Sequence, residues 1–267
     1  MKSLARVYIQ QFKTTLSTMF QYRASLFIWM IGQILEPVVY LVVWSVVSTG
    51  NGGSVGGYTT AQFAGYFVIF MLVNQATYTW IMYEFEYRVR EGILSAALLH
   101  PVHPIHSDIA DNLSSKIITL PVMLVIAVAL GLAFHASVSL HPWSVALFLP
   151  VLLLAFLIRF LLEWTLALAA FWTTRVSAIN QTYFVLVLFL SGQLAPLSLL
   201  PRALQTAAQI LPFRWMLGFP VELLTGRLTL QQALAGLGIQ FAWVAGAVLL
   251  VRLVWRIGIK VYSAVGA

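Results

Sequence analysis

The sequence contains no cysteine and few charged residues. Asp, Glu, Lys and Arg make up 9% of its 267 residues, whereas a soluble domain usually carries about 25%. Hydrophobic residues account for 61%. A chain of this composition cannot cover a folded surface with polar side chains, so a soluble enzyme or a nucleic-acid-binding protein is excluded. The lack of cysteine also excludes disulfides, thiol catalysis and cysteine-ligated metals. We therefore predict an integral membrane protein.

Several catalytic motifs are absent as well. The sequence has no G-x-x-x-x-G-K-[ST] loop to hold ATP, no G-x-S-x-G of esterases and no H-E-x-x-H of zinc proteases. His100, His103 and His106 invite comparison with a metal site, but the prolines between them prevent the i,i+4 presentation of a helical site. A turn at a helix end is favoured there. We expect no enzyme activity, cofactor or metal in this chain.

Long hydrophobic runs are abundant. A membrane-crossing helix needs about 20 mostly apolar residues, and six runs meet this requirement. The alternation expected of a β-barrel is absent. The sequence therefore predicts an all-α polytopic membrane protein, with an amphipathic segment at 1–23 and a transmembrane domain at 24–267. The six predicted spans are residues 24–48, 61–83, 117–137, 143–172, 176–197 and 230–251.

The distribution of basic residues predicts the orientation. Cytoplasmic loops carry an excess of Lys and Arg, and eleven of these residues fall on one side of the predicted spans against three on the other. Both termini are then cytoplasmic, and the loops at 49–60 and 135–142 are external. The eleven are Lys2, Arg6, Lys13, Arg23, Arg88, Arg90, Lys116, Arg175, Arg252, Arg256 and Lys260, and the three are Arg202, Arg214 and Arg227.

The N-terminal segment has the pattern of an interfacial helix. Apolar residues recur at helical spacing, with Lys2, Arg6 and Lys13 on the polar side, which is typical of a helix lying on the cytoplasmic leaflet. A cleavable signal is not expected, because no short apolar core leads to a small-residue cleavage site. A mitochondrial transit peptide is the less favoured alternative, since the helix continues into the first span. The apolar positions are Leu4, Ala5, Tyr8, Ile9, Phe12, Leu16, Met19 and Phe20.

The predicted cytoplasmic segment at 84–116 is not an ordinary loop. Two acid-before-base pairs at i,i+4, Glu84 with Arg88 and Glu86 with Arg90, favour an exposed helix. Gly92 interrupts this helix, and a second stretch runs to Leu99. Such a segment either docks on a partner or is a solvated connector, and the residues alone leave both open. The apolar face is predicted at Phe85, Val89, Ile93 and Ala97, and the helix is predicted to end at Pro101 and Pro104.

The predicted external segment at 191–227 is punctuated by proline and glycine. Its apolar stretches at 204–211 and 213–224 are too short to cross a bilayer. A plain extracellular loop would be more polar, so we predict short re-entrant or interfacial helices, buried in protein or lining a wet cavity. The interrupting residues are Gly192, Pro196, Pro201, Pro212, Pro220 and Gly226.

Three ionisable residues fall inside the predicted spans. Arg159 and Glu163 lie four residues apart, so they can pair on one helix face, whereas Glu36, before Pro37, has no obvious partner. A gradient-driven transporter usually needs several unpaired acids along one path. A secondary transporter using Glu36 is therefore kept as the alternative function, beside a non-transporting assembly or sensor subunit.

Two motifs resemble those of a known family. The run from Val89 to Pro104, VREGILSAALLHPVHP, is similar to the R-x-G-x-[LI]-[DS]-x-x-L-L-R-P-v-x-P segment of ABC-2-type permeases. The run LSGQLAP from Leu190, followed by two further Leu-Pro steps, resembles the family's proline-rich external segment. His100 and Ser95 depart from the first pattern, where Arg and Asp are common. The positions that match are Arg90, Gly92, Leu98, Leu99, Pro101 and Pro104, then Gly192, Pro196, Pro201, Pro212 and Phe213.

The resemblance covers nearly the whole chain and implies a function. In this family the helix between spans two and three is a coupling helix that docks on a separate ATPase subunit, which holds ATP and Mg. By resemblance, Glu84, Glu86, Arg88 and Arg90 belong to that helix, the N-terminal helix is a second contact, and the broken helices form an external gate.

We accordingly expect one permease subunit of an exporter in the bacterial inner membrane. A second permease subunit, identical or paralogous, completes the pathway, as in the short branch of the family that often occurs as paired subunits. The aromatic content of 13% favours an amphipathic, lipid-like or drug-like substrate.

Overall fold

The computed structural model describes residues 2–173 and 176–262, and within them it is helical apart from one short hairpin. Four of the described helices are long and apolar enough to cross a membrane. The prediction of an all-α membrane fold is therefore confirmed. These helices are α2 (Arg23–Gly50), α6 (Pro104–Ala133), α7 (Pro142–Ala167, extended by the 3₁₀ turn η1 at Leu168–Phe171) and α12 (Leu230–Gly258).

The predicted second and fifth spans are not single long helices. Residues 61–83 are divided between α3 (Thr60–Thr77) and α4 (Ile81–Arg90), with a break between them. The fifth span is the 14-residue helix α8 (Ser177–Leu190), because Gly192 takes a left-handed conformation with φ of +89° just after its end. The prediction of one continuous helix at each of these places is wrong.

The helix predicted at 117–137 begins earlier. His103 caps α6 by accepting a hydrogen bond from the Ile105 amide, and Pro104 is its first residue, where a missing N–H costs nothing. Pro104 therefore starts a helix instead of ending one. Residues 104–116 belong to α6, and Lys116, counted above among loop cations, is buried in it. Arg175, another of those cations, lies outside the described residues.

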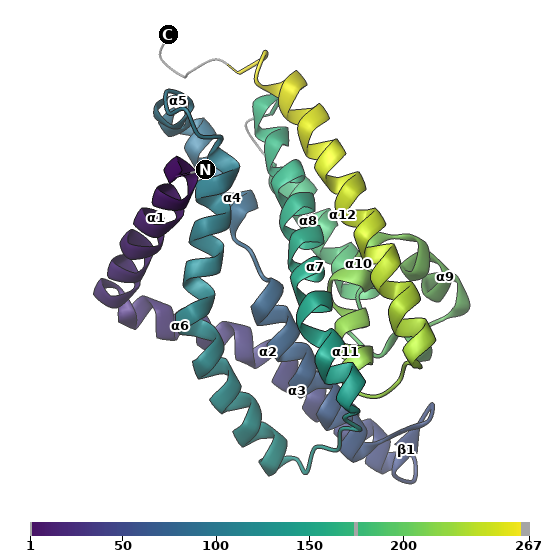
Figure 1. The fold of residues 1–267 in the computed structure, drawn as a ribbon. Helices are drawn as coiled ribbons and strands as arrows, with labels where there is room; N and C mark the ends of the chain where they lie inside the picture. Colours follow the sequence, from purple (N-terminus) through teal and green to yellow (C-terminus); the bar gives the residue numbers. More distant parts are fainter. Residues whose placement is uncertain (1, 174–175, 263–267) are drawn as a thin grey trace.

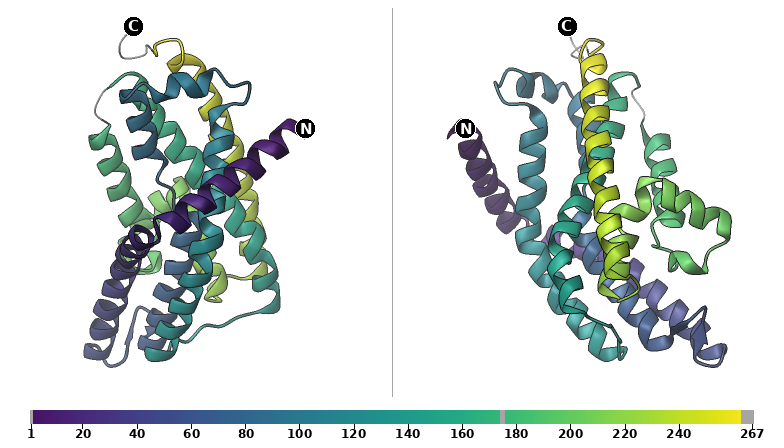
Figure 2. Two further views of the ribbon diagram at one scale, coloured as in Figure 1. Left: turned by 90° about the vertical axis from the view of Figure 1, so that its left-hand side faces the viewer. Right: turned by 45° about the vertical axis from the view of Figure 1, so that its right-hand side comes forward.

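The N-terminal residues form α1 (Lys2–Gln21), which turns directly into α2. This helix packs along the first half of α6, as both views in Figure 2 show. The Tyr8 hydroxyl hydrogen-bonds His106 Nδ1 at 3.2 Å, and Gln11 donates to Asp111 at 2.8 Å. The predicted helix is present, and its position on a leaflet stays a prediction.

Helix α7 is the central helix of the fold, in contact with α3, α4, α10, α11 and α12. The start of α1, the short helix α5 (Ile93–Leu98) and the end of α12 lie towards one end of the molecule, which we call the α5 end (Figure 1). The strands β1 (Ser54–Val55) and β2 (Tyr58–Thr59) lie at the opposite end, the hairpin end. Gly56 and Gly57, both with positive φ, supply the two-residue turn between the strands.

Short helices fill the segment between α8 and α12. They are the 3₁₀ turn η2 (Leu197–Leu199), α9 (Arg202–Ile210), α10 (Pro212–Met216) and α11 (Gly218–Leu224). Helices α10 and α11 pack against α7, whereas α9 protrudes from the bundle (Figure 2). The predicted short helices are therefore present, and their re-entry into a membrane stays a prediction.

Candidate functional site

The α4–α5 segment, residues 81–98, lies at the α5 end and contains the predicted docking residues up to Leu98, which Leu99, Pro101 and Pro104 follow. Gly92 joins the two helices in a left-handed conformation with φ of +71°, which explains why glycine stands there. Leu94 is fully buried and Leu98 is partly buried against the core, while Leu99 is 88% exposed. Ile93 is exposed, so its predicted place on the apolar face is wrong, and Leu94 occupies that place instead.

Two further residues of the predicted docking set end the segment. Pro101 is exposed beside Leu99, whereas Pro104 is buried as the first residue of α6. The segment therefore presents an apolar tip, Leu99 with Pro101, on a base that is fixed to the bundle.

Of the two predicted ion pairs of α4, Glu84 with Arg88 is confirmed and Glu86 with Arg90 is not formed among the described residues. Arg88 lies 3.9 Å from Glu84 but only 2.7 Å from Asp108, and Arg90 pairs with its neighbour Glu91 at 3.2 Å. The Arg88 side chain turns to Asp108 because this carboxylate is buried, where an opposite charge is worth more than in water.

Asp108 is the functional candidate that the sequence pattern did not reveal. It lies one turn into α6, is 4% exposed, and accepts hydrogen bonds from Arg88 and from Trp164 Nε1 at 2.9 Å. It thereby connects α4, α6 and α7. The available signal was an acid near the start of a membrane helix, a position that almost always has a partner.

The three histidines do not form one site. His103 lies against the rings of Trp164 and Trp255, and this burial lowers the pKa of its imidazole. His106 contacts Tyr8, and His100 is exposed. Among the described residues no group of three possible ligands is placed to hold a metal ion.

A buried charged cluster lies at the break between α3 and α4. Arg159 and Glu163, both on α7, form the predicted pair at 2.8 Å. Arg159 is 3% exposed to solvent and Glu163 is 1% exposed. Arg159 also donates to Asn74 Oδ1 at 2.8 Å and Thr77 Oγ1 at 3.1 Å. Glu163 accepts from Tyr183 of α8 at 3.0 Å and from Thr79. The cluster therefore joins α3, α7 and α8.

Lys116 completes the polar contacts of this break. Its ammonium donates to the carbonyl of Tyr78, the residue after α3, at 2.7 Å, and also lies 5.2 Å from the centre of the Phe156 ring. Irregular backbone at membrane depth is tolerated only where protein or water satisfies its polar groups. Arg159 and Lys116 both lie near the C-terminal, electronegative end of α3, where cations are favourable.

The contacts of Asp108 at the start of α6 lead towards the charged cluster. Trp164, which donates to Asp108, follows Glu163 directly in α7. One chain of contacts therefore runs from Arg88 through Asp108 and α7 to Tyr183 of α8.

The residues predicted to shape an external gate lie where short helices begin. Pro196 and Pro201 directly precede η2 and α9, and Pro212 is the first residue of α10 with the buried Phe213 next to it. The backbone after α8 is satisfied by side chains of two other helices, since Tyr66 donates to the Gly192 carbonyl and Trp44 Nε1 to the Leu194 carbonyl, each at 2.8 Å. The irregular stretch is thus held inside the protein.

Glu36 has partners, contrary to the prediction. Gln193 Nε2 donates to its Oε1 at 2.6 Å, and the Tyr40 hydroxyl lies 3.4 Å from the same atom. The residue is nevertheless exposed on α2, among exposed apolar side chains such as Leu35 and Val39.

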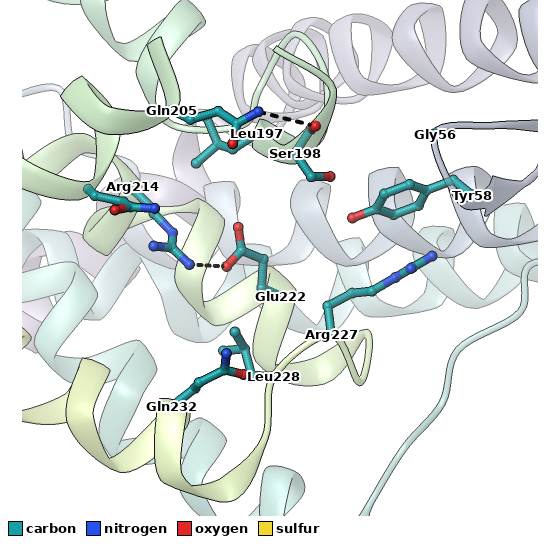
Figure 3. Close-up of a pocket in the computed structure, with 11 residues that line it drawn as sticks. Gly56, Tyr58, Leu197, Ser198, Gln205, Arg214, Glu222, Arg227, Leu228 and Gln232 are labelled. Atoms are coloured by element: carbon teal, nitrogen blue, oxygen red, sulfur yellow. Dashed lines mark hydrogen bonds and ion pairs between the residues drawn. The ribbon is translucent and has the colours of Figure 1, made fainter. Parts of the chain in front are cut away.

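A polar pocket of about 380 Å³ opens beside the β1–β2 hairpin (Figure 3). Arg214 pairs with Glu222 at 2.6 Å on one side, and the Arg227 guanidinium lies 3.8 Å from the centre of the Tyr58 ring on the other. Burial raises the pKa of the Tyr58 hydroxyl, which therefore stays protonated at neutral pH.

Comparison with known proteins agrees with this architecture. The family model described as "ABC-2 family transporter protein" matches residues 34–266. The chain belongs to this family. Neither a curated protein nor a solved structure matches it. Membership in the ABC-2 family makes the chain a permease, a membrane component of a transporter that is not itself catalytic and generally works with an ATPase subunit. The resemblance inferred from the two motifs is thereby confirmed.

Proposed function

We propose that this ABC-2 permease is the membrane-spanning subunit of an ATP-driven exporter in the bacterial inner membrane. In this arrangement α3 with α4, and α8 with its following segment, complete six crossings, and the α5 end faces the cytoplasm. A separate ATPase subunit holds ATP and Mg and docks on the α4–α5 segment and the residues up to Pro104. The common end of α1, α5 and α12 supports this orientation (Figure 1).

The observation that carries the coupling proposal is the contact chain through Asp108. An ATPase that moves the exposed tip at Leu99 moves α4, and Arg88 of α4 is bonded to Asp108 at 2.7 Å. Asp108 in turn is bonded to Trp164, next to the Arg159–Glu163 pair. Movement at the docking end is therefore passed to the helices around the charged cluster, and from Tyr183 to the proposed gate segment.

A second permease subunit, identical or paralogous, is proposed to share the pathway. The exposed position of Glu36 in α2 supports it, because a carboxylate facing lipid is costly and intramembrane acids almost always face protein or water. Export of an amphipathic, lipid-like or drug-like substrate is supported by an apolar groove of about 460 Å³. The groove is bordered by α7, α8, α10 and α12.

The test replaces the exposed apolar tip of the docking segment. We expect Leu99→Asp to reduce co-purification of the ATPase subunit about tenfold or more, because a charge replaces an apolar contact at the interface. Leu140→Asp, at a leucine that is 60% exposed in the loop before α7, is the matched control and should leave the complex intact. Equal recovery of the ATPase with both variants would refute docking at Leu99.

A further inference from the structure

The polar pocket beside the hairpin continues into a second hollow along α12. The second hollow, of about 450 Å³, shares Gln209, Arg214, Leu228 and Gln232 with the first. Beyond these shared residues its lining becomes apolar, with Trp215, Phe219, Ala235 and Ile239. A charged compartment thus adjoins an apolar one, which is the shape required by a ligand with a polar head and a hydrocarbon tail.

The charged compartment carries one uncompensated positive charge. Glu222 is neutralised by Arg214, whereas no carboxylate among the described residues lies within ion-pair distance of Arg227. Arg227 is held in place by hydrogen bonds to the Gly57 carbonyl at 3.1 Å and Gln62 Oε1 at 2.9 Å. A guanidinium fixed in this way and left without a counter-ion favours an anionic ligand.

Arg214 also lines the pocket, but its charge is paired with Glu222 at 2.6 Å. Its Nε–H is buried and makes no hydrogen bond within the part of the chain that the structure describes, so a ligand in the pocket does not reach this atom unless the side chain moves. Arg227 is therefore the cation that an anionic ligand meets.

Helices α11 and α12 are in close contact beside the apolar compartment. A Cβ atom at Gly236 would lie 2.3 Å from the Phe219 ring, so this ring packs directly on the backbone of α12. The neighbouring Ala235 and Ile239 remain exposed and line the hollow. The apolar compartment can therefore hold a hydrocarbon chain but has few groups that would bind a charged one.

We propose that the two hollows together bind an anionic phospholipid, with its phosphodiester at Arg227 and one acyl chain along α12. A zwitterionic lipid fits less well, because the Glu222 carboxylate that would receive its cationic group is already paired. A free phosphate compound would leave the apolar compartment empty. The site goes beyond the proposed export function, since it needs neither ATP nor a second permease.

The experiment measures lipid binding to the purified full chain by native mass spectrometry. Phosphatidylglycerol is compared with phosphatidylcholine of the same acyl chains and with glycerol phosphate, a small phosphate compound without acyl chains. We expect one tightly held phosphatidylglycerol per chain. Phosphatidylcholine, which lacks the net negative charge, and glycerol phosphate, which lacks the acyl chains, should each bind at least about tenfold more weakly.

Two pairs of variants locate the site. Arg227→Gln should weaken phosphatidylglycerol binding about tenfold, whereas Arg202→Gln, at the exposed first residue of α9, should not. Ala235→Trp should fill the apolar compartment and weaken the binding of phosphatidylglycerol without affecting the binding of glycerol phosphate. Ala242→Trp, at an exposed alanine two turns further along α12, is its control.

Three results would overturn the proposal. Equal affinity for phosphatidylglycerol and phosphatidylcholine would show that the head charge is not recognised. Equal losses in Arg227→Gln and Arg202→Gln would show that only the overall surface charge matters. Binding of glycerol phosphate as tight as that of phosphatidylglycerol would reduce the site to one for small phosphate compounds. None of these results depends on the ATPase, so they are separate from the test of the export function.

Discussion

Asp108 illustrates how one buried residue can carry a mechanical connection. Its carboxylate accepts from a guanidinium of α4 and an indole of α7, so three helices meet at one side chain. Its neighbour one turn on, Asp111, accepts from Gln11 and Thr15 of α1 instead. Two acids on one helix thus connect it to different parts of the protein, and Asp108 is the one that contacts Trp164, the residue after Glu163.

Replacing Asp108 should uncouple the two ends. Asp108→Asn removes the negative charge beside Arg88, and loss of a hydrogen bond between charged groups should lower stability by about 2 kcal/mol. In the assembled transporter we expect ATP hydrolysis to persist while substrate export falls, as measured side by side in proteoliposomes. Asp111→Asn is the control, because its amide oxygen can still accept from Gln11 and Thr15. Parallel losses of hydrolysis and export in Asp108→Asn would contradict the connecting role.

How much of the site could be predicted depends on the distance along the chain between partners. The Arg159–Glu163 pair follows from i,i+4 spacing and was predicted correctly, because helix geometry alone brings the two together. The same spacing also brings Glu84 within 3.9 Å of Arg88, but it was misleading for Glu86 and Arg90, because Arg90 pairs with its neighbour Glu91 instead. The contacts of Asp108 with Arg88 and Trp164 join residues 20 and 56 positions apart. Only the tertiary fold can show such contacts.

At the scale of elements, the breaks in the helices matter more than the helices. The long apolar helices follow from composition, but the positions of the two breaks did not. Tyr78 and Trp80 keep the first break within a hydrophobic run, and Gly192, although named as an interrupting residue, lies inside the span predicted at 176–197. These breaks are stable because side chains from other helices donate hydrogen bonds to the backbone carbonyls exposed there. Lys116 satisfies the carbonyl after α3, and Tyr66 and Trp44 satisfy carbonyls after α8. Hydropathy cannot reveal donors that come from distant helices.

The break after α8 should be sensitive to a single methyl group. In Gly192→Ala the Cβ atom would lie 2.4 Å from the Tyr66 hydroxyl, and φ of +89° is unfavourable for alanine. We expect a loss of about 1–3 kcal/mol, seen as a lower thermal midpoint of the purified protein. Gly246→Ala in α12, where nothing lies within 4 Å of the added atom, should be neutral or stabilising. An unchanged midpoint in Gly192→Ala would mean that the turn adopts another conformation in the membrane.

At the scale of the whole molecule, α7 connects two ends that differ in character. The α5 end carries an exposed apolar tip and a network of charges leading inward, and the hairpin end carries short helices around a polar pocket. Because α7 contacts both α4, the proposed docking helix, and the short helices α10 and α11, we expect a shift of α7 to affect both groups of helices. This arrangement could expose a substrate pathway alternately to the two sides of the membrane only if the α5 end and the hairpin end face opposite sides.

The number of crossings can be measured directly, because the chain has no cysteine of its own. With six crossings, a cysteine at Leu99→Cys is cytoplasmic and one at Leu140→Cys is external. If only the four long helices cross, and the start of the chain stays cytoplasmic, the two positions exchange sides.

We expect a membrane-impermeant maleimide to label Leu140→Cys in intact cells, and Leu99→Cys only after permeabilisation. Gly53→Cys, in the hairpin loop after α2, should be labelled in intact cells under both arrangements and serves as the control. Labelling of Leu99→Cys in intact cells, with Leu140→Cys protected, would establish four crossings and remove the α4–α5 segment from the reach of a cytoplasmic ATPase.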